Sequence, residues 1–287
     1  MKISDIYNNK TSLPLSFEVF PPKGDEIDSK IDRLIDELNI LKKFNPKLVS
    51  VTYGAGGSNR DTSFEIVNRL KADEFNVMPH FTCICTKRST IRAHFNELQK
   101  MNIENVLALR GDEPKDNKIC YMDFKYANEL VEYLKSFTDF SIGIAGYPEG
   151  HISAPDLNTD ILNLKKKVDA GGDVIFTQLF FDNSKFYNYL ELLKRNNINI
   201  PVVAGILPIS SYAQLDKMLS LAKVTIPDAL LSKIEKFKDN NDYIKKLGIE
   251  YATNQCLDLI KNNVDGLHFY TLNKSYSTAK ILENINL

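Results

Sequence analysis

Residues 106–114, VLALRGDEP, hold the pattern that decides the fold of this 287-residue chain. An apolar run over 106–109 ends abruptly in the turn sequence RGDEP, whose proline prevents a strand from continuing. A continuous apolar run between turn residues is typical of a strand that is buried on both faces, as in a parallel sheet. Charged groups at the end of such a strand lie at the mouth of a core, so we expect Arg110 and Asp112 at a rim.

Seven other stretches repeat this pattern, so that the predicted strands cover 15–20, 48–53, 77–83, 106–109, 140–145, 174–181, 200–206 and 267–272. All but the last begin at intervals of about 30 residues, the length of one strand-plus-helix unit. Helical spacing fills the intervals, for example over 25–44, and two extra helices are expected near 227–237 and 243–260. The pattern predicts one domain over 1–287, an α/β (β/α)8 TIM barrel with extra helices between strands 7 and 8. A doubly wound sheet is the main alternative, but no G-x-G-x-x-G motif follows the first strand.

The composition argues against several classes of function. A formal net charge of −1 lacks the basic excess expected of a nucleic-acid binder. No apolar stretch reaches the ~20 residues that span a membrane, and the first residues lack the apolar core of a signal peptide. Four cysteines in a chain of this size suit reduced thiols, so we expect a cytoplasmic protein. Cys83 and Cys85 stand too close for a zinc knuckle and no second pair exists, so no metal site is expected.

Polar side chains stand at the ends of the predicted strands, where a barrel of this type places its active site. They are Glu18, Thr52, Tyr53, His80, Arg110, Asp112, Tyr147, Glu149, His151, Gln178, His268 and Tyr270. No lysine lies within a predicted strand, which disfavours a Schiff-base aldolase. The histidines of the set come from separate units and do not form a convincing metal site. His94 falls on a predicted helix and is expected at the surface.

Glu18 is the strongest single candidate for catalysis. Phe17, Val19 and Phe20 flank it, and a carboxylate in apolar surroundings is desolvated, which favours its protonated form. A carboxylic acid that keeps its proton near neutral pH can serve as a general acid. The alternative is a structural ion pair between Glu18 and Arg110 or a nearby lysine.

Asp112 and Gln178 are further candidates for binding a polar ligand. Asp112 is either a second carboxylate of the site or a turn-forming residue after glycine, and Gly111 lets a flat ligand approach the backbone. Gln178 lies inside an apolar run, where a buried amide needs partners for its donor and its acceptor. Either a heterocyclic ligand or a structural network could supply these partners.

One face of the fifth predicted helix carries Asp160, Asn163 and Lys167 at positions i, i+3 and i+7. An acid, an amide and a cation on one face fit a ribose and a pyrophosphate, although such a pattern is more often a solvated face. The glycine-rich loop at 54–57 is compatible with phosphate binding, but glycine-rich turns are weak evidence.

Nine stretches form a recognisable set that runs from the first strand to the last: SFEVFPPK (16–23), VSVTYGAGGS (49–58), PHFTC (79–83), ALRGDEP (108–114), YPEGH (147–151), DILNLKKKVDAG (160–171), TQLFFD (177–182), GILPIS (205–210) and HFYTLNK (268–274). Together they resemble the methylenetetrahydrofolate reductase family, specifically the flavin-dependent catalytic barrel in its short bacterial form. ALRGDEP, YPEGH with the helix after it, and HFYTLN are highly specific as a set.

This resemblance implies a mechanism and its cofactors. NADH or NADPH passes a hydride to non-covalently bound FAD and leaves, and 5,10-methylenetetrahydrofolate then occupies the same face of the flavin. Glu18 matches the family's general acid, whose proton opens the five-membered ring of the folate to an iminium. Hydride from the reduced flavin then gives 5-methyltetrahydrofolate, which feeds methionine synthesis. A homo-oligomer is expected by the same resemblance.

The resemblance also implies roles for individual residues. Catalytic roles fall to Glu18 and Asp112. The positions that match flavin contacts are Thr52, Tyr53, His80, Arg110, Gly111, Asp112, Tyr126, Ala127, Tyr147, His151, Asp160, Asn163, Lys166 and Lys167. Those that match folate contacts are Asp112, Gln178, Gln214 and Lys274. Lys274 stands where an arginine is usual and cannot reproduce a bidentate carboxylate contact, and Met218 stands where some members place an aromatic residue.

Two other functions stay open. One is another flavin-dependent barrel oxidoreductase, for example one that oxidises an amino acid such as proline. The other is a barrel subunit that receives its electrons from a partner protein. No ribose-discriminating motif separates NADH from NADPH as the donor.

Overall fold

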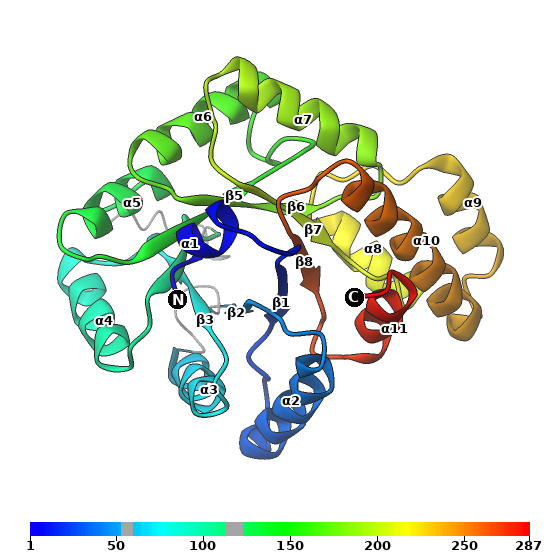
Figure 1. Ribbon diagram of the computed structural model, residues 1–287, viewed down its shortest axis with the longest axis horizontal. Helices are drawn as coiled ribbons and strands as arrows, with labels where there is room; N and C mark the ends of the chain where they lie inside the picture. The colour runs from blue at the N-terminus through cyan, green and yellow to red at the C-terminus, as the bar shows by residue number, and fades with distance from the viewer. Residues whose placement is uncertain (53–59, 113–122) are drawn as a thin grey trace.

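Eight parallel strands close into a barrel in chain order, which confirms the predicted TIM barrel (Figure 1). The computed structural model describes residues 1–52, 60–112 and 123–287. The strands are β1 (Leu15–Val19), β2 (Leu48–Val51), β3 (Val77–Thr82), β4 (Asn105–Leu109), β5 (Ser141–Gly146), β6 (Val174–Leu179), β7 (Val202–Ile206) and β8 (Leu267–Tyr270). Several end one or two residues before the predicted position.

Helices surround the barrel and connect its strands (Figure 1). After β1 to β6 they are α2 (Ile27–Lys42), α3 (Arg60–Ala72), α4 (Arg88–Lys100), α5 (Ala127–Lys135), α6 (Leu157–Asp169) and α7 (Asn183–Arg195). The interval between β7 and β8 holds α8 (Tyr212–Leu221), α9 (Asp228–Lys236) and α10 (Asn241–Lys261), and α11 (Tyr276–Asn284) follows β8. The last two helices before β8, α9 and α10, are the predicted extra pair.

Side chains alternate across the wall of the barrel, because successive residues of a strand point to opposite faces. Phe17 and Val19 of β1 belong to the outer core cluster, which also contains Leu34 and Leu38 of α2. Glu18, which stands between Phe17 and Val19 in the strand, points inward. The inner cluster is built from Leu48, Met78, Leu107, Val174, Phe176 and Val203. A residue's place in this alternation therefore decides whether it can reach the site.

A short helix that the sequence did not predict, α1 (Ile3–Asn8), packs against the amino-terminal end of the barrel (Figure 1). Its buried residues Ile3, Ile6 and Tyr7 belong to the inner core cluster. The backbone N–H of Ile3 donates to Asn105 Oδ1 at 2.7 Å, at the first residue of β4. Six residues are too few for a helical period to show in the sequence. Because α1 covers this end, the site is expected at the opposite end of the barrel.

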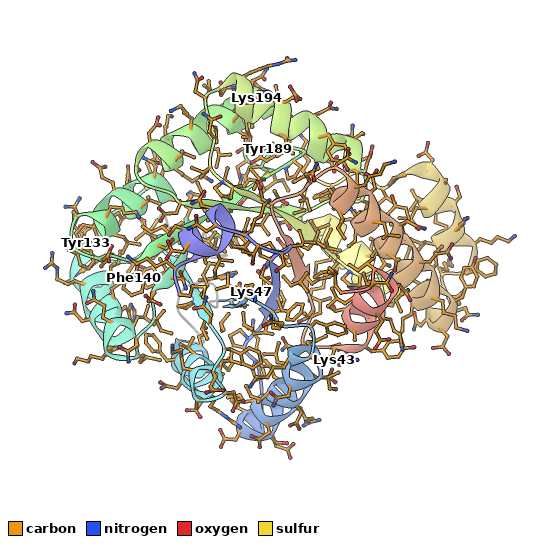
Figure 2. The ribbon with its side chains drawn as sticks, in the orientation of Figure 1. Lys43, Lys47, Tyr133, Phe140, Tyr189 and Lys194 are labelled. Carbon is orange, nitrogen blue, oxygen red and sulfur yellow. The ribbon has the colours of Figure 1, made fainter. Side chains whose placement is uncertain are left out.

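The end of β5 is packed tightly against α7. Tyr189 of α7 is fully buried and points toward the barrel, whereas Lys194 of the same helix points outward (Figure 2). A Cβ atom at Gly146 would overlap the Tyr189 hydroxyl and lie 2.6 Å from Ile175 Cγ2. This position therefore requires glycine, because no room remains for a side chain. The next residue, Tyr147, is the first residue of the rim.

We predict that Gly146→Ala lowers the free energy of unfolding by about 1–3 kcal/mol, because an added methyl group overpacks this site. Urea denaturation measures the change. Tyr189→Phe alone is the control and should cost about 1 kcal/mol or less, since it removes a single hydroxyl group and keeps the ring. The double variant should recover part of the loss. If it is no more stable than Gly146→Ala, the hydroxyl is not the source of the overlap.

Candidate active site

The predicted acid, Glu18, lies inside the barrel between two histidines. Its side chain is buried, and its Oε2 atom is 3.4 Å from His80 Nε2 and 3.5 Å from His268 Nε2. Since Phe17 and Val19 point into the outer core, Glu18 points into the interior, where β3 and β8 bring the two imidazoles. The prediction that Glu18 is buried was right, but the flanking apolar residues are not its surroundings.

Two serines fix the imidazoles from the layer below. Ser50 Oγ and His80 Nε2 share a hydrogen bond of 2.6 Å, and Ser16 Oγ and His268 Nδ1 share one of 2.8 Å. The hydroxyl of Tyr7 in α1 donates to Ser16 Oγ at 3.3 Å. Tyr7, Ser16 and His268 therefore form a hydrogen-bonded chain from the helix at the closed end of the barrel to the imidazole beside the acid.

The structural alternative for Glu18, an ion pair with Arg110 or a lysine, is wrong within the described part of the chain. The side chains nearest its carboxyl group there are the two imidazoles. Arg110 Nε instead donates to the carbonyl oxygen of Lys125 at 3.2 Å. Burial lowers the pKa of His80 to about 4, although Glu18 opposes this shift, so this imidazole is neutral near pH 7. Burial, together with Glu18, also raises the pKa of Tyr270 well above its ordinary value.

A cavity of about 700 Å³ opens at the carboxyl ends of β4, β5 and β6. It brings together seven residues that were predicted from separate units: Arg110, Gly111, Asp112, Tyr147, Glu149, His151 and Gln178. Thr82 also lines it, two residues after His80 in β3, so the Glu18 cluster lies one layer below. Glu18 itself is not among the lining residues.

Gly111 lines this cavity at a position where packing and backbone conformation require glycine. Its φ is +86°, and a Cβ atom there would lie 2.9 Å from both Thr82 Cβ and Ile84 Cγ2. Glycine alone combines this backbone conformation with this close approach. Asp112 follows on the rim, where it is exposed.

The predicted face of α6 divides into a buried part and an exposed part. Asp160 is buried, and Lys167 Nζ donates to the carbonyl oxygen of Ala145 at 2.6 Å and lies 5.9 Å from the centre of the Tyr147 ring. Burial lowers the pKa of Lys167 to about 8 against the opposing charge of Asp160, and burial raises the pKa of Asp160. Asn163 is exposed and accepts a hydrogen bond from Lys166 Nζ at 3.1 Å.

A second cavity, of about 470 Å³, lies at the carboxyl ends of β7 and β8. Gln214, Lys274 and Tyr270 line it. Gln214 Oε1 accepts from the backbone N–H and the hydroxyl of Ser210, each at 2.6 Å, and its Nε2 donates to Pro208 O at 3.1 Å. The predicted folate contacts are thus divided, with Asp112 and Gln178 on the larger cavity and Gln214 and Lys274 on the smaller one.

The other residues that the sequence singled out lie outside the lining of the two cavities or outside the described part of the chain. Thr52 N donates to Val19 O at 3.0 Å, and Tyr126, which is half exposed, stands directly before Ala127 at the start of α5. Tyr53 lies outside the described residues. The prediction that His94 is on the surface was wrong, because its ring is buried, 5.4 Å from the ring of Phe81.

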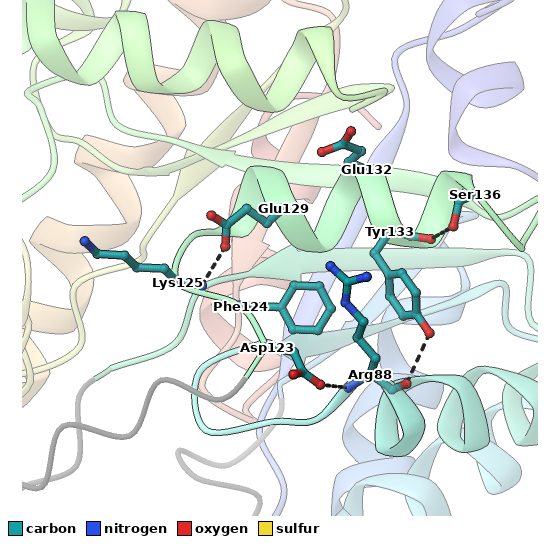
Figure 3. A pocket seen from close by; sticks show the side chains of 8 residues that line it. All are labelled: Arg88, Asp123, Phe124, Lys125, Glu129, Glu132, Tyr133 and Ser136. Atoms are coloured by element: carbon teal, nitrogen blue, oxygen red, sulfur yellow. Dashed lines mark hydrogen bonds between the residues drawn. The ribbon is translucent and has the colours of Figure 1, made fainter.

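A third pocket, of about 520 Å³, lies on the outside of the barrel beside α4 and α5 (Figure 3). The Arg88 guanidinium lies 5.5 Å from the centre of the Phe124 ring and 5.2 Å from that of Tyr133. Asp123 accepts the backbone N–H of Arg88 at 2.7 Å, and Tyr133 OH donates to the Arg88 carbonyl at 3.3 Å. These contacts hold α4 against α5, and none of the predicted site residues lines this pocket.

Across residues 1–52, 60–112 and 123–287, no group of three or more histidine, cysteine or acidic side chains could hold a metal ion. In the same part of the chain, no helix combines the length and the apolar character needed to cross a membrane.

A closed barrel that holds a buried acid below two cavities at the carboxyl ends of its strands has the architecture of a barrel enzyme. The family model described as "Methylenetetrahydrofolate reductase" matches residues 2–286. The chain therefore belongs to the methylenetetrahydrofolate reductase family.

Curated relatives fall into a long and a short group. "Methylenetetrahydrofolate reductase (NADH) 1" of Arabidopsis thaliana is 36% identical over all of this chain, which spans 51% of that protein. "5,10-methylenetetrahydrofolate reductase" of Buchnera aphidicola subsp. Schizaphis graminum is 36% identical over 93% of this chain and 90% of its own length. The protein of the same name from Escherichia coli (strain K12) is 34% identical over 95% of this chain and 90% of its own length. The chain thus spans about half of the plant relative and most of the bacterial ones.

Among solved structures, an "Uncharacterized protein from Clostridium thermocellum" that "binds two copies of 5-methyl-5,6,7,8-tetrahydrofolic acid" has a similar fold. The TM-score is 0.72 at 13% sequence identity, over 99% of this chain and 98% of that one.

The burial of His80 predicts that acid destabilises the fold. Its pKa is about 4 in the folded chain against an ordinary 6.5, so the unfolded chain binds more protons between these pH values. The free energy of unfolding should therefore fall as the pH drops from 6.5 towards 4 and level off below. Between pH 7 and pH 4.5 this contribution is about 2 kcal/mol.

Urea denaturation at several pH values, with His80→Gln as the comparison, isolates this contribution. Between pH 7 and pH 4.5, the free energy of unfolding of the variant should fall by about 2 kcal/mol less than that of the original protein. Equal pH dependence of the two proteins would contradict a neutral buried His80.

Proposed function

We propose that this protein reduces 5,10-methylenetetrahydrofolate to 5-methyltetrahydrofolate, with bound FAD and with NADH or NADPH as the electron donor. The observation that carries the proposal is the buried carboxyl group of Glu18, placed between His80 and His268 beneath the barrel rim. Membership of the family supports the choice of substrate. We further propose that the protein acts in the cytoplasm and that its product feeds methionine synthesis.

In this proposal Glu18 supplies the proton that opens the five-membered ring of the folate. A general acid must lie within hydrogen-bonding reach of the substrate nitrogen that takes its proton, either directly or through one water molecule. His80 and His268 hold one carboxylate oxygen from two sides, which fixes the orientation of the carboxyl group. The two serines behind them prevent the imidazoles from rotating away.

The larger cavity fits a bound flavin. Gly111 lines it without a side chain, and the rings of Tyr147 and His151 meet edge to face with their centres 4.7 Å apart. Arg110 and Asp112 also line this cavity and place a cation and an acid where they could hold the polar edge of a heterocycle or a ribose. FAD, when bound, would supply the hydride chemistry.

The folate is proposed to extend from the larger cavity to the smaller one. Gln178 has a side-chain amide that can both donate to and accept from a pterin, and it lines the larger cavity beside Asp112. Its Oε1 already accepts the backbone N–H of Leu179 at 2.9 Å, so its N–H groups are the ones that face a ligand. Lys274 lines the smaller cavity and supplies a positive charge for the folate carboxylates.

The first expected outcome concerns the cofactor. We expect the purified protein to be yellow and to contain one non-covalent FAD per chain, which its absorption spectrum and the flavin released by denaturation will measure. Anaerobic mixing with NADH or NADPH should bleach the flavin, and added methylenetetrahydrofolate should restore its colour. A colourless protein that cannot be reconstituted with FAD would contradict the proposal, and a flavin that proline reduces and that methylenetetrahydrofolate does not reoxidise would favour the alternative barrel.

The second expected outcome separates the two half-reactions. Glu18→Gln removes the transferable proton but keeps the size of the side chain, so flavin reduction by the nicotinamide should stay within a few-fold of the original rate. Folate reduction should fall by about 10² or more. Glu132→Gln, on the exposed surface of α5, is the matched control and should leave both rates unchanged. Equal loss of both half-reactions in Glu18→Gln would show that the residue is structural.

A further inference from the structure

The two imidazoles beside Glu18 are hydrogen-bonded in different ways. His80 meets two groups with the same nitrogen, because its Nε2 lies 2.6 Å from Ser50 Oγ and 3.4 Å from Glu18 Oε2. A ring nitrogen has one hydrogen or one lone pair in the plane of the ring, so the shorter contact, with Ser50, occupies it. His268 instead meets Ser16 with Nδ1, at 2.8 Å, and Glu18 with Nε2, at 3.5 Å. Of the two imidazoles, His268 thus keeps a separate nitrogen for the acid.

Ser16 determines which nitrogen of His268 carries the hydrogen. Its hydroxyl oxygen accepts from Tyr7 OH at 3.3 Å, and the group has one hydrogen of its own to donate. Two acceptors lie within reach of this hydrogen: His268 Nδ1 at 2.8 Å and the carbonyl oxygen of Leu267 at 3.4 Å. The shorter contact is the better hydrogen bond, so Nδ1 is the acceptor. A neutral ring then carries its hydrogen on Nε2, the nitrogen that faces Glu18.

Tyr7 sets the direction of this chain from the closed end of the barrel. Its side chain is buried, and burial raises the pKa of its hydroxyl group, although the hydrogen bond to Ser16 opposes this shift. The phenol therefore keeps its proton and donates a hydrogen bond to the Ser16 oxygen. With that donor in place, the hydrogen of Ser16 points onward to His268 Nδ1 and not back toward Tyr7.

Packing keeps the His268 ring in this orientation. The side chain is 1% exposed, and the ring centres of Phe176 and Tyr270 each lie 5.3 Å from its own, both edge to face. Ser16 and His268 are also register partners on the neighbouring strands β1 and β8, so the backbone fixes their separation. A rotation that exchanged Nδ1 and Nε2 would have to displace the two aromatic rings.

We propose that Tyr7 and Ser16 are positioning residues that hold His268 as the Nε2–H tautomer, which donates a hydrogen bond to Glu18 after this acid has given its proton to the folate. This inference rests on the proposed function. In that step the O–H bond of Glu18 breaks and an N–H bond forms on the folate, while His268 keeps its own hydrogen throughout. The carboxylate that remains is buried, and a donor that already points at it stabilises it without rearrangement. The 3.5 Å contact shortens as the charge appears.

The first test observes the tautomer directly. The chain has four histidines, so labelling them with ¹⁵N gives a small set of ring-nitrogen signals, and His268→Gln identifies those of His268 by their loss. We expect the Nε2–H tautomer for His268 in the unaltered protein near neutral pH, and a mixture of both tautomers in Ser16→Ala. A His268 ring that carries its hydrogen on Nδ1, or on both nitrogens, in the unaltered protein would overturn the inference.

The second test is kinetic and uses the FAD-loaded protein. Ser16→Ala should slow the folate half-reaction about tenfold, with the KM for the folate and the rate of flavin reduction by the nicotinamide each within about twofold. Tyr7→Phe should slow the folate half-reaction about two- to threefold, since Ser16 keeps its own hydrogen. Ser50→Ala removes the equivalent hydroxyl behind His80 and should slow this half-reaction less than Ser16→Ala does. A larger effect of Ser50→Ala would contradict the special role of His268.

Ser141→Ala is the matched control. Ser141 is also a buried serine at the closed end of the barrel, where its Oγ accepts the backbone N–H of Ser4 in α1 at 3.0 Å and donates to Asp173 at 3.4 Å. This variant should leave both half-reactions unchanged. Equal slowing in Ser141→Ala and Ser16→Ala, or equal loss of both half-reactions in Ser16→Ala, would overturn the inference.

The two tests also separate this inference from the proposed function. If the unaltered protein shows the Nε2–H tautomer of His268 but does not reduce the folate, the proposed function is wrong. If it reduces the folate with His268 in the other tautomer, the inference alone is wrong.

Discussion

The central interaction of the structure is the contact between the Glu18 carboxyl group and the imidazoles of His80 and His268. The three side chains come from β1, β3 and β8, and they meet only because the sheet closes into a barrel. A carboxyl group in the interior is costly unless polar groups surround it. The serines behind the imidazoles, and Tyr7 of α1 behind Ser16, provide a continuous set of partners down to the closed end of the barrel.

Above this cluster, the rim separates two cavities with different chemistry. The larger one is lined by Arg110, by Asp112 and by the rings of Tyr147 and His151, which meet edge to face, and the smaller one has lysines and hydroxyl groups. α8 stands between them, because Gln214 near its start lines the smaller cavity and Ser220 near its end lines the larger one. The Glu149 carboxylate accepts the backbone N–H of Thr225 at 3.0 Å and so ties the segment after α8 to the rim. One helix thus limits both binding regions.

The barrel and the rim residues could be predicted because both depend on local signals: buried strands about 30 residues apart, each ending in polar groups. The neighbours of Glu18 could not be predicted in this way, because the two imidazoles come from strands that are far from Glu18 in the sequence. The local reading assigned Phe17 and Val19 as its surroundings, although the period of two places them on the other face. The prediction for His94 was wrong for a similar reason: a polar residue on a helix was expected to face water, but its ring faces Phe81.

The most direct measurement is a crystal structure of the protein with FAD and 5-methyltetrahydrofolate bound. The account predicts that the pterin lies against the flavin with a ring nitrogen within hydrogen-bonding reach of the Glu18 carboxyl group, directly or through one water molecule. It also predicts that both imidazoles keep their contacts with Glu18 Oε2. A pterin bound away from Glu18, with the carboxyl group still closed off beneath the cavity floor, would contradict the assignment of Glu18 as the acid.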